Sequence, residues 1–155
     1  MPAASIMQEM PCSSAEVFAL LHDYSRRLEW DTLLREARLT RGCTIAQKGA
    51  TSLCIGKHLG GCIGIETKYL TFKPGEVAAV EMINDTPFFE HFAASIRHTD
   101  TPTGSLATYR FQFTARPRYL RWILHPVMRY VLQWETRKRL KALAQFLGEV
   151  GTPNT

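Results

Sequence analysis

The residues best suited to chemistry in this sequence are a carboxylate and a guanidinium near its C-terminal end. Glu135 and Arg139 are four positions apart in a segment with helical spacing. At about 100° per residue, both project close to the line of Leu124, Met128 and Val131. Charges on an apolar face are costly unless they are paired, so this placement indicates a polar group that meets the head of a bound molecule. The alternative is that the apolar stripe rotates and leaves both side chains in water.

The remaining tyrosines and histidines include candidate acids and bases, but their spacing does not indicate a metal site. Tyr109 and His91 join Glu135 and Arg139 as candidate catalytic groups if the protein is an enzyme. His91 and His98 are seven residues apart, so on one unbroken strand they face opposite ways. The five histidines show no ligand spacing, and the G-x-S-x-G, H-E-x-x-H and G-x-G-x-x-G motifs are absent. We therefore expect neither a metal site nor a nucleotide or other cofactor.

Apolar side chains from both parts of the chain are predicted to form the wall of a binding site. A small-molecule site needs mainly apolar rings and a few polar groups. A ligand that buries about 350 Å² of apolar surface gains roughly 9 kcal/mol before the costs of association, so we expect micromolar affinity. For each ring, packing in the core without ligand contact is the alternative. The predicted ligand-binding residues are Trp30, Tyr69, Phe92, Tyr109, Phe111, Phe113, Met128, Val131, Glu135 and Arg139.

The N-terminal elements that must position these groups are a strand and two short helices. Ala3–Met10 is apolar at alternate places and ends at a proline, which suits a strand. Ser13 is the expected N-cap of a helix that runs to about His22, and Glu16 completes a capping box. A second helical turn is expected over Tyr24–Glu29.

The middle of the chain, from Leu33 to Arg116, is expected to form about six antiparallel strands. Glycine, proline and asparagine separate runs that are rich in branched and aromatic residues. Thr108–Arg116 alternates polar and apolar residues, as a strand with one wet face does. The glycine-dense segment Gly56–Gly64 admits two interpretations, a mobile lip of the binding site or a tight hairpin without a gating role.

The last third of the chain predicts one long helix. Pro126 suits its first turn, where the missing N–H is not needed. Its apolar stripe comprises Leu124, Met128, Val131 and Leu132, continued with some rotation by Leu140, Leu143 and Leu147. This helix must cover the sheet. A curved sheet and a helix do not match along their whole length, so we expect a gap between them.

Two stretches of the sequence resemble the START-like helix-grip superfamily, or SRPBCC. Val17–Tyr24, followed by Leu28-Glu29-Trp30-Asp31, resembles the family opening "VF.ll.D....p.W". Arg137–Leu143, followed by Glu149, resembles the closing helix pattern "L..LK...E". The resemblance implies an α+β helix-grip fold (β-α-α-β6-α), a strongly curved antiparallel sheet wrapped around the long C-terminal helix. We expect one domain over residues 1–155 with an ordered core at about 3–149.

The resemblance also implies a cavity that takes an apolar or amphipathic molecule. The family includes polyketide cyclases/dehydrases and lipid-transfer domains, and it shares no set of catalytic residues. The leading hypothesis is therefore a binding protein for a lipid-, quinone- or polyketide-like ligand. The alternative is a cyclase or dehydratase that uses the same cavity. A uniformly apolar cavity lining would favour a carrier protein, whereas a titratable side chain in the cavity with a hydrogen-bond partner would favour an enzyme.

Charge and composition bound the remaining possibilities. The net charge is +5, and segment 116–149 holds eight Lys/Arg against two Asp/Glu. This segment predicts a solvated helix face, contact with an anionic membrane or an acidic partner, or, less favourably, binding to nucleic acid or the ribosome. The first ten residues lack a basic start and a long apolar run, so we expect no signal peptide and a cytoplasmic protein.

Overall fold

The computed structural model of the chain describes residues 2–57 and 64–150. A strand and two short helices come first: β1 (Ala3–Met10), α1 (Ser14–Leu21) and α2 (Arg27–Trp30). The following strands are β2 (Leu34–Thr40), β3 (Thr51–Gly56), β4 (Gly64–Lys73), β5 (Val77–Met82), β6 (Phe89–Thr101) and β7 (Gly104–Ala115). A short 3-10 helix, η1 (Arg118–Leu120), leads into the long helix α3 (Arg121–Val150). This order confirms the predicted α+β helix-grip fold.

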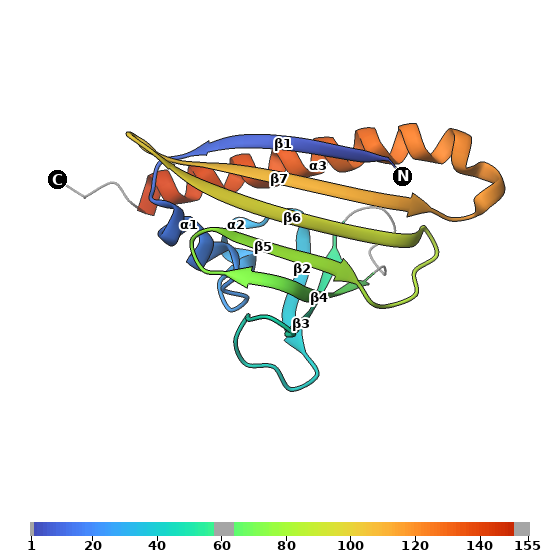
Figure 1. Cartoon of the computed structure of the whole chain (residues 1–155), viewed down its shortest axis with the longest axis horizontal. Coiled ribbons are helices and arrows are strands. Elements are labelled where there is room, and N and C mark those ends of the chain that lie inside the picture. The colour runs from blue at the N-terminus through green and yellow to red at the C-terminus, as the bar shows by residue number, and fades with distance from the viewer. Residues whose placement is uncertain (1, 58–63, 151–155) are drawn as a thin grey trace.

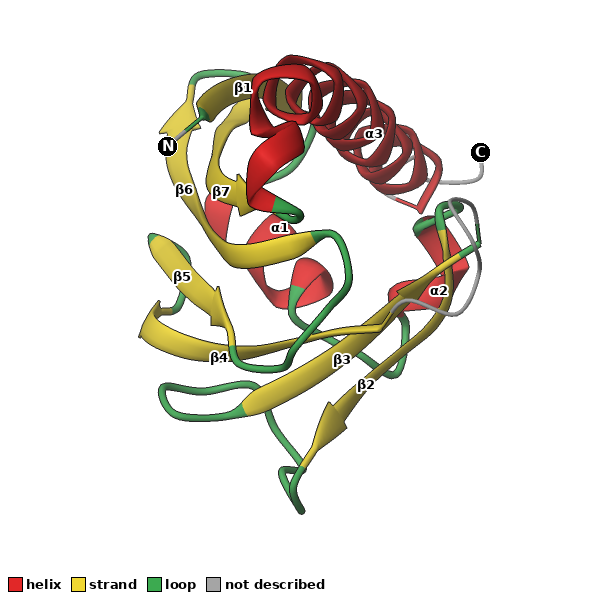
Figure 2. Cartoon of the chain, turned by 90° about the vertical axis from the view of Figure 1, so that its right-hand side faces the viewer, coloured by secondary structure: helices red, strands yellow, loops and turns green. Residues whose placement is uncertain are grey.

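The strands form one antiparallel sheet in the order β1-β7-β6-β5-β4-β3-β2. Helix α3 runs along β1 and β7 and meets α2 (Figure 1). Seen from one end, the sheet curls from β1 and β7 beside α3 round to β2 and β3, with α1 inside the curve (Figure 2). The concave face of the sheet therefore looks toward the helices, which places any interior site between them.

Local signals in the sequence account for the first helix and the last strand. The Ser13 side chain accepts a hydrogen bond from the Glu16 backbone N–H at 3.4 Å, which confirms the N-cap of α1. Strand β7 alternates as predicted, and its inward residues Phe111, Phe113 and Ala115 are buried. The period of two in the sequence thus becomes the inner face of the sheet.

The long helix begins earlier than its proline predicts. Helix α3 begins at Arg121, so Pro126 lies inside it rather than in its first turn. Proline removes the hydrogen bond to the carbonyl four residues earlier, that of Trp122. Both residues lie on an exposed part of the helix, where water can replace that bond. Within the described residues, no helix combines the length and apolar character that crossing a bilayer requires.

The inner face of α3 rotates along its length. Leu124, Met128 and Leu132 pack against the core as half-buried side chains, and further along Leu140 and Leu143 are fully buried. Steps of four residues advance by about 400°, so the buried line turns by about 40° at each step. The predicted rotation of the stripe is confirmed. It leaves the first half of the helix less deeply packed than the second.

Candidate functional site

A line of hydrogen-bonded side chains crosses the interior between α1 and the sheet. The Tyr69 hydroxyl on β4 lies 2.8 Å from Nδ1 of His22 and 2.8 Å from the Tyr24 hydroxyl. Tyr24 donates to Ser52 Oγ on β3 at 3.0 Å, and Ser52 Oγ lies 3.1 Å from Thr67 Oγ1 on β4. The line ties the segment after α1 to two neighbouring strands.

Burial keeps this line uncharged at neutral pH. Burial lowers the pKa of His22 to about 3, with smaller contributions from Arg27 and His98. Burial also raises the pKa of Tyr69, and the adjacent Tyr24 raises it further. The line therefore offers neutral donors and acceptors rather than charges. Nε2 of His22 is buried and has no hydrogen-bond partner among the described residues.

A buried carboxylate joins α2 to α3. Asp31 has no exposed side-chain surface, and its Oδ2 lies 3.0 Å from Nε of both Arg27 and Arg139. Its Oδ1 accepts a hydrogen bond from the Leu33 N–H at 3.2 Å. The Arg27 guanidinium also lies 4.9 Å from the centre of the Trp30 ring. We call Arg27, Asp31 and Arg139 the arginine–aspartate cluster.

The cluster is not charge-balanced. Two guanidinium groups face one carboxylate, so the cluster carries one net positive charge. The contact of Arg139 with Asp31 has ion-pair distance but lacks hydrogen-bond alignment, since Nε of Arg139 has no hydrogen-bond partner among the described residues. The Arg139 side chain is 23% exposed. It is therefore the member of the cluster with both spare hydrogen-bonding capacity and accessible surface.

Tyr109 on β7 brings a further hydroxyl within electrostatic reach of the cluster. Burial raises the pKa of Tyr109, and the charges of Arg139 and Arg27 oppose that rise. The Tyr109 hydroxyl forms no hydrogen bond with a described residue, although the residue packs against the core. Because Tyr109 is half-buried rather than fully buried, its unpartnered hydroxyl is free to meet a ligand oxygen.

The apolar residues predicted to line the site fall into two groups. Trp30, Tyr69, Phe111 and Phe113 are at most 3% exposed and belong to the core. Phe92, Tyr109 and Met128 pack against the same core but remain half-buried. The Phe92 and Phe111 rings stack with centroids 6.4 Å apart. The structure therefore brings the predicted rings of β6 and β7 together.

Accessible surface remains on the concave face beyond these rings. Ile65, Val80 and Met82 belong to β4 and β5, pack against the core and are half-buried. Val80 pairs with Tyr69 on one side and with Ala94 on the other, and both partners are buried. Because directly paired residues share one face of a sheet, Val80 points inward and still keeps accessible surface.

Glu135 and Arg139 of α3 do not form an ion pair with each other. Arg139 contacts Asp31 of the α2 end rather than Glu135, and Glu135 has no ion-pair partner among the described residues. Arg139 thus reaches toward α2, whereas Glu135 lies half-buried one turn earlier. Val131 is half-buried as well and is not packed against the core.

Two shallow hollows lie at the surface, away from these groups. One of about 410 Å³ lies between α1 and the end of α3, beside Arg26 and Phe146. The other, of about 520 Å³, is lined by Pro87, Glu90, Arg116, Pro117 and Arg118. Neither is lined by a predicted ligand-binding residue. Of the glycine-dense segment Gly56–Gly64, residues 58–63 lie outside the described residues.

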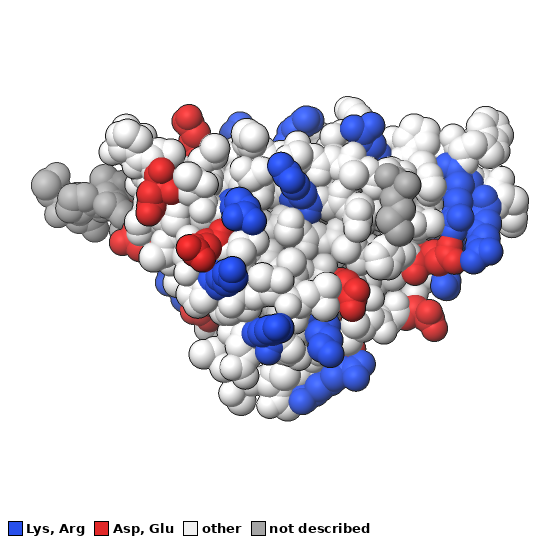
Figure 3. Space-filling model, in the orientation of Figure 1, with Lys and Arg blue, Asp and Glu red and all other residues white. Residues whose placement is uncertain are grey.

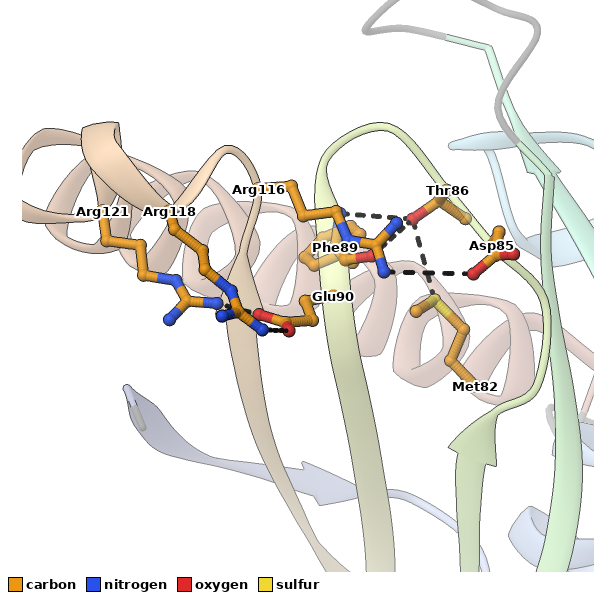
Figure 4. Close-up of polar contacts among 8 residues, drawn as sticks. All are labelled: Met82, Asp85, Thr86, Phe89, Glu90, Arg116, Arg118 and Arg121. Atoms are coloured by element: carbon orange, nitrogen blue, oxygen red, sulfur yellow. Dashed lines mark hydrogen bonds and ion pairs between the residues drawn. The ribbon is translucent and has the colours of Figure 1, made fainter.

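The second hollow belongs to a clamp that holds the start of α3 on the sheet. Arg118 and Arg121 converge on the Glu90 carboxylate of β6, and Arg116 points toward Asp85 (Figure 4). Arg121 Nε also donates to the Ala115 carbonyl at 3.0 Å. These arginines have partners within the fold, so we assign them a structural role.

Most polar residues of the interior site are not predicted from the sequence. His22, Tyr24, Trp30 and Asp31 all lie in the stretch with the family-like opening, but only Trp30 is predicted as a site residue. The signal that points to Asp31 is Arg27 four residues earlier, since that spacing pairs charges on a helix. No comparable signal marks Ser52, whose contact with Tyr24 spans 28 residues.

A family model described as "Polyketide cyclase / dehydrase and lipid transport" matches residues 1–148 of the chain. Among curated proteins, none matches it in sequence. Solved structures with a similar fold include TTHA0849 from Thermus thermophilus, which is 9% identical with a TM-score of 0.82 and covers 97% of this chain and 100% of that one.

The similar structures also include aromatase/cyclases. The Zhui aromatase/cyclase from Streptomyces sp. R1128 is 10% identical with a TM-score of 0.78, covering 97% of this chain and 95% of that one. The di-domain ARO/CYC StfQ from the steffimycin biosynthetic pathway is 12% identical with a TM-score of 0.79, covering 96% of this chain. The chain spans about half of StfQ, 51%. At such identities these likenesses show the fold.

Proposed function

The chain belongs to the polyketide cyclase/dehydrase and lipid transport family, and we propose that it binds an amphipathic molecule on the concave face of its sheet. The ligand has an apolar, polyketide-, quinone- or lipid-like body. Its polar end carries an anionic or enolic oxygen. The apolar body lies against Phe92, Val80 and Met128, and the oxygen meets Arg139 and Tyr109.

The observation that carries this proposal is the unbalanced arginine–aspartate cluster beside an unpartnered hydroxyl. One net positive charge inside an apolar surface favours a ligand that brings negative charge. Arg139 and Tyr109 both have unused hydrogen-bonding capacity within the part of the chain that the structure describes. Half-buried apolar residues on the same concave face supply the remaining contact area.

A cyclase or dehydratase is the second candidate, because the interior is not uniformly apolar. His22, Tyr69 and Tyr24 form a connected polar line next to the apolar face. A pKa of about 3 makes His22 a weak base at neutral pH, so it is poorly suited to remove a proton. A reaction in this site would instead depend on holding a reactive chain and on hydrogen bonds to a developing enolate.

Thermal unfolding with matched ligands tests the proposal. A ligand that binds the folded form raises the melting temperature. We expect aromatic or fatty carboxylic acids to raise it, and the corresponding methyl esters to raise it less. Arg139→Met should lower affinity for the acids about tenfold or more and leave the esters unchanged. The matched control is Arg137→Met, an exposed arginine without an ion-pair partner among the described residues.

Native mass spectrometry separates the two candidates. A carrier purified from its own host retains an unmodified small molecule, whereas an enzyme that cyclises and dehydrates an added linear poly-ketone releases a product lighter by the water lost. No stabilisation by any acid, and equal affinity of acids for the wild type and the Arg139→Met variant, would contradict the proposed recognition by the cluster.

A further inference from the structure

The outer face of η1 and of the first half of α3 carries large apolar side chains in solvent. Tyr119, Trp122 and Tyr130 are 78%, 77% and 69% exposed. Ile123, Val127 and Trp134 are between 42% and 54% exposed. Single exposed apolar residues are ordinary, but a contiguous set indicates a contact surface. We call these six residues the aromatic face.

The spacing of these residues places them on one side of the helix. At about 100° per residue, Ile123, Val127, Tyr130 and Trp134 fall within a sector of about 60°, and Trp122 projects about 80° to one side of it. This sector is opposite to Leu124, Met128 and Leu132, which pack against the core. The first half of α3 is therefore apolar on both sides, which the fold itself does not require.

Cations without an ion-pair partner among the described residues lie beside the aromatic face and follow it along α3. Arg129, Arg137, Lys138 and Lys141 are exposed and have no carboxylate partner among the described residues. Lys138 Nζ lies 5.0 Å from the Trp134 ring centre, with its charge at the edge of the apolar surface. At the end of the molecule where α3 begins, Figure 3 shows basic side chains next to acidic ones, with uncharged surface beside them.

This chemistry fits a lipid surface better than a second copy of the chain. A symmetric dimer through this face would bring two sets of cations together, since segment 116–149 has eight basic and two acidic residues. Ile123 and Val127 offer nothing to a nucleic acid, whereas they suit acyl chains. Tryptophan and tyrosine favour the level of lipid headgroups, and nearby lysine and arginine contact anionic ones.

We propose that α3 docks by its aromatic face on an anionic phospholipid membrane. The helix lies in the plane of the interface, with Trp122, Tyr130 and Trp134 among the headgroups. Arg137, Lys138 and Lys141 contact the lipid phosphates. The inference rests on exposure, spacing and charge alone, so it does not depend on which ligand the interior binds.

Vesicle binding tests this surface. We expect the protein to co-sediment with vesicles of phosphatidylcholine and phosphatidylglycerol, less with phosphatidylcholine alone, and less as salt rises. Each cation near the surface contributes about a fivefold change in affinity, so Arg137→Gln/Lys138→Gln/Lys141→Gln should weaken binding on the order of a hundredfold. The control replaces three exposed lysines of the sheet and its loops, with Lys48→Gln, Lys68→Gln and Lys73→Gln.

The apolar contacts have their own readout. Trp122 and Trp134 are exposed and Trp30 is 2% exposed, so brominated lipids should quench the wild type. The Trp122→Phe/Trp134→Phe variant retains only Trp30 and should show little quenching while still binding. Trp122→Ser/Tyr130→Ser/Trp134→Ser should lose binding, whereas Met7→Ser/Leu70→Ser, at two other exposed apolar sites, should keep it.

Other outcomes overturn the proposal. Absence of wild-type binding to anionic vesicles contradicts it directly. A dimer that the three serine substitutions dissociate assigns the aromatic face to a second copy instead. Saturable, stoichiometric RNA binding that the same substitutions remove assigns it to nucleic acid. Circular dichroism of every variant checks that the fold is retained.

Discussion

Nε of Arg139 lies 3.0 Å from Oδ2 of Asp31, a carboxylate without exposed side-chain surface. The contact joins the long helix α3 to the end of α2. The same oxygen lies 3.0 Å from Nε of Arg27, so one carboxylate serves two cations. This arrangement holds the two helices together and also leaves the interior with surplus positive charge.

Removing either partner of this contact should destabilise the protein, but unequally. Asp31→Ala leaves two guanidinium groups without their carboxylate and should cost about 3–5 kcal/mol of unfolding free energy. Arg139→Ala leaves Asp31 paired with Arg27 and should cost about 1–3 kcal/mol. Urea unfolding measures both. Arg137→Ala is the control and should stay within about 0.5 kcal/mol. Equal stability of Arg139→Ala and Arg137→Ala would contradict the contact.

Loss of the hydroxyl should destabilise the protein at Tyr69 but not at Tyr109. Tyr69→Phe removes a partner from both His22 and Tyr24 and should cost about 1–3 kcal/mol of stability. Tyr109→Phe removes a hydroxyl without a partner among the described residues and should leave stability nearly unchanged or slightly higher. It should nevertheless weaken binding of acidic ligands. Chemical denaturation and ligand titration of both variants measure this, and a Tyr109→Phe variant as destabilised as Tyr69→Phe would disagree.

Two buried histidines should make the protein less stable in mild acid. Burial lowers the pKa of His22 to about 3 and that of His98 to about 4. An unfolded histidine has a pKa of about 6.5. Below pH 6.5 the unfolded chain therefore binds protons that the folded protein does not, and the unfolding free energy falls. Each histidine contributes a slope of up to about 1.4 kcal/mol per pH unit, which vanishes above pH 6.5.

His98→Leu isolates one of these contributions. Neither ring nitrogen of His98 has a hydrogen-bond partner among the described residues, so the substitution breaks no such bond. Urea unfolding between pH 5 and 7 should show about half of the wild-type slope for the variant. An unchanged slope would show that His98 has the same pKa in the folded and the unfolded protein, contrary to this prediction.

The helices and strands that depend on neighbouring residues are the part of the fold that the sequence predicts. The Ser13 cap of α1, the alternation of β7 and the inward line of α3 each follow from neighbouring residues. The sequence places the start of α3 too late, because Pro126 suits a first turn. A proline inside a helix is tolerated where solvent reaches the freed carbonyl, and the sequence does not show where that holds.

The candidate site is harder to predict because its contacts are long-range. The sequence predicts that Arg139 faces inward, but its partner is Asp31, which is 108 positions away by residue number. Local spacing favours Glu135 instead, since residues four apart on a helix are neighbours. The line from His22 to Thr67 likewise depends on which strands become adjacent. Sequence patterns set the face of a residue, whereas the partner across the core depends on the tertiary fold.

Filling the concave face tests whether it holds a ligand. Val80 on β5 points inward yet keeps accessible surface, whereas Ala78, two residues earlier on the same face, is 3% exposed. Val80→Phe places additional atoms where a ligand would lie. If the proposed ligand site lies beside Val80, the ring enters that site, so this variant should keep its stability within about 1 kcal/mol and lose ligand binding.

Ala78→Leu supplies the matched control, since it adds similar bulk to a packed position. Overpacking there should cost about 1–3 kcal/mol and leave ligand affinity unchanged in the protein that remains folded. Thermal unfolding with and without an acidic ligand measures both effects. Should Val80→Phe destabilise as much as Ala78→Leu, the inner face is closely packed at Val80 as well, and a ligand has no room between β5 and α3.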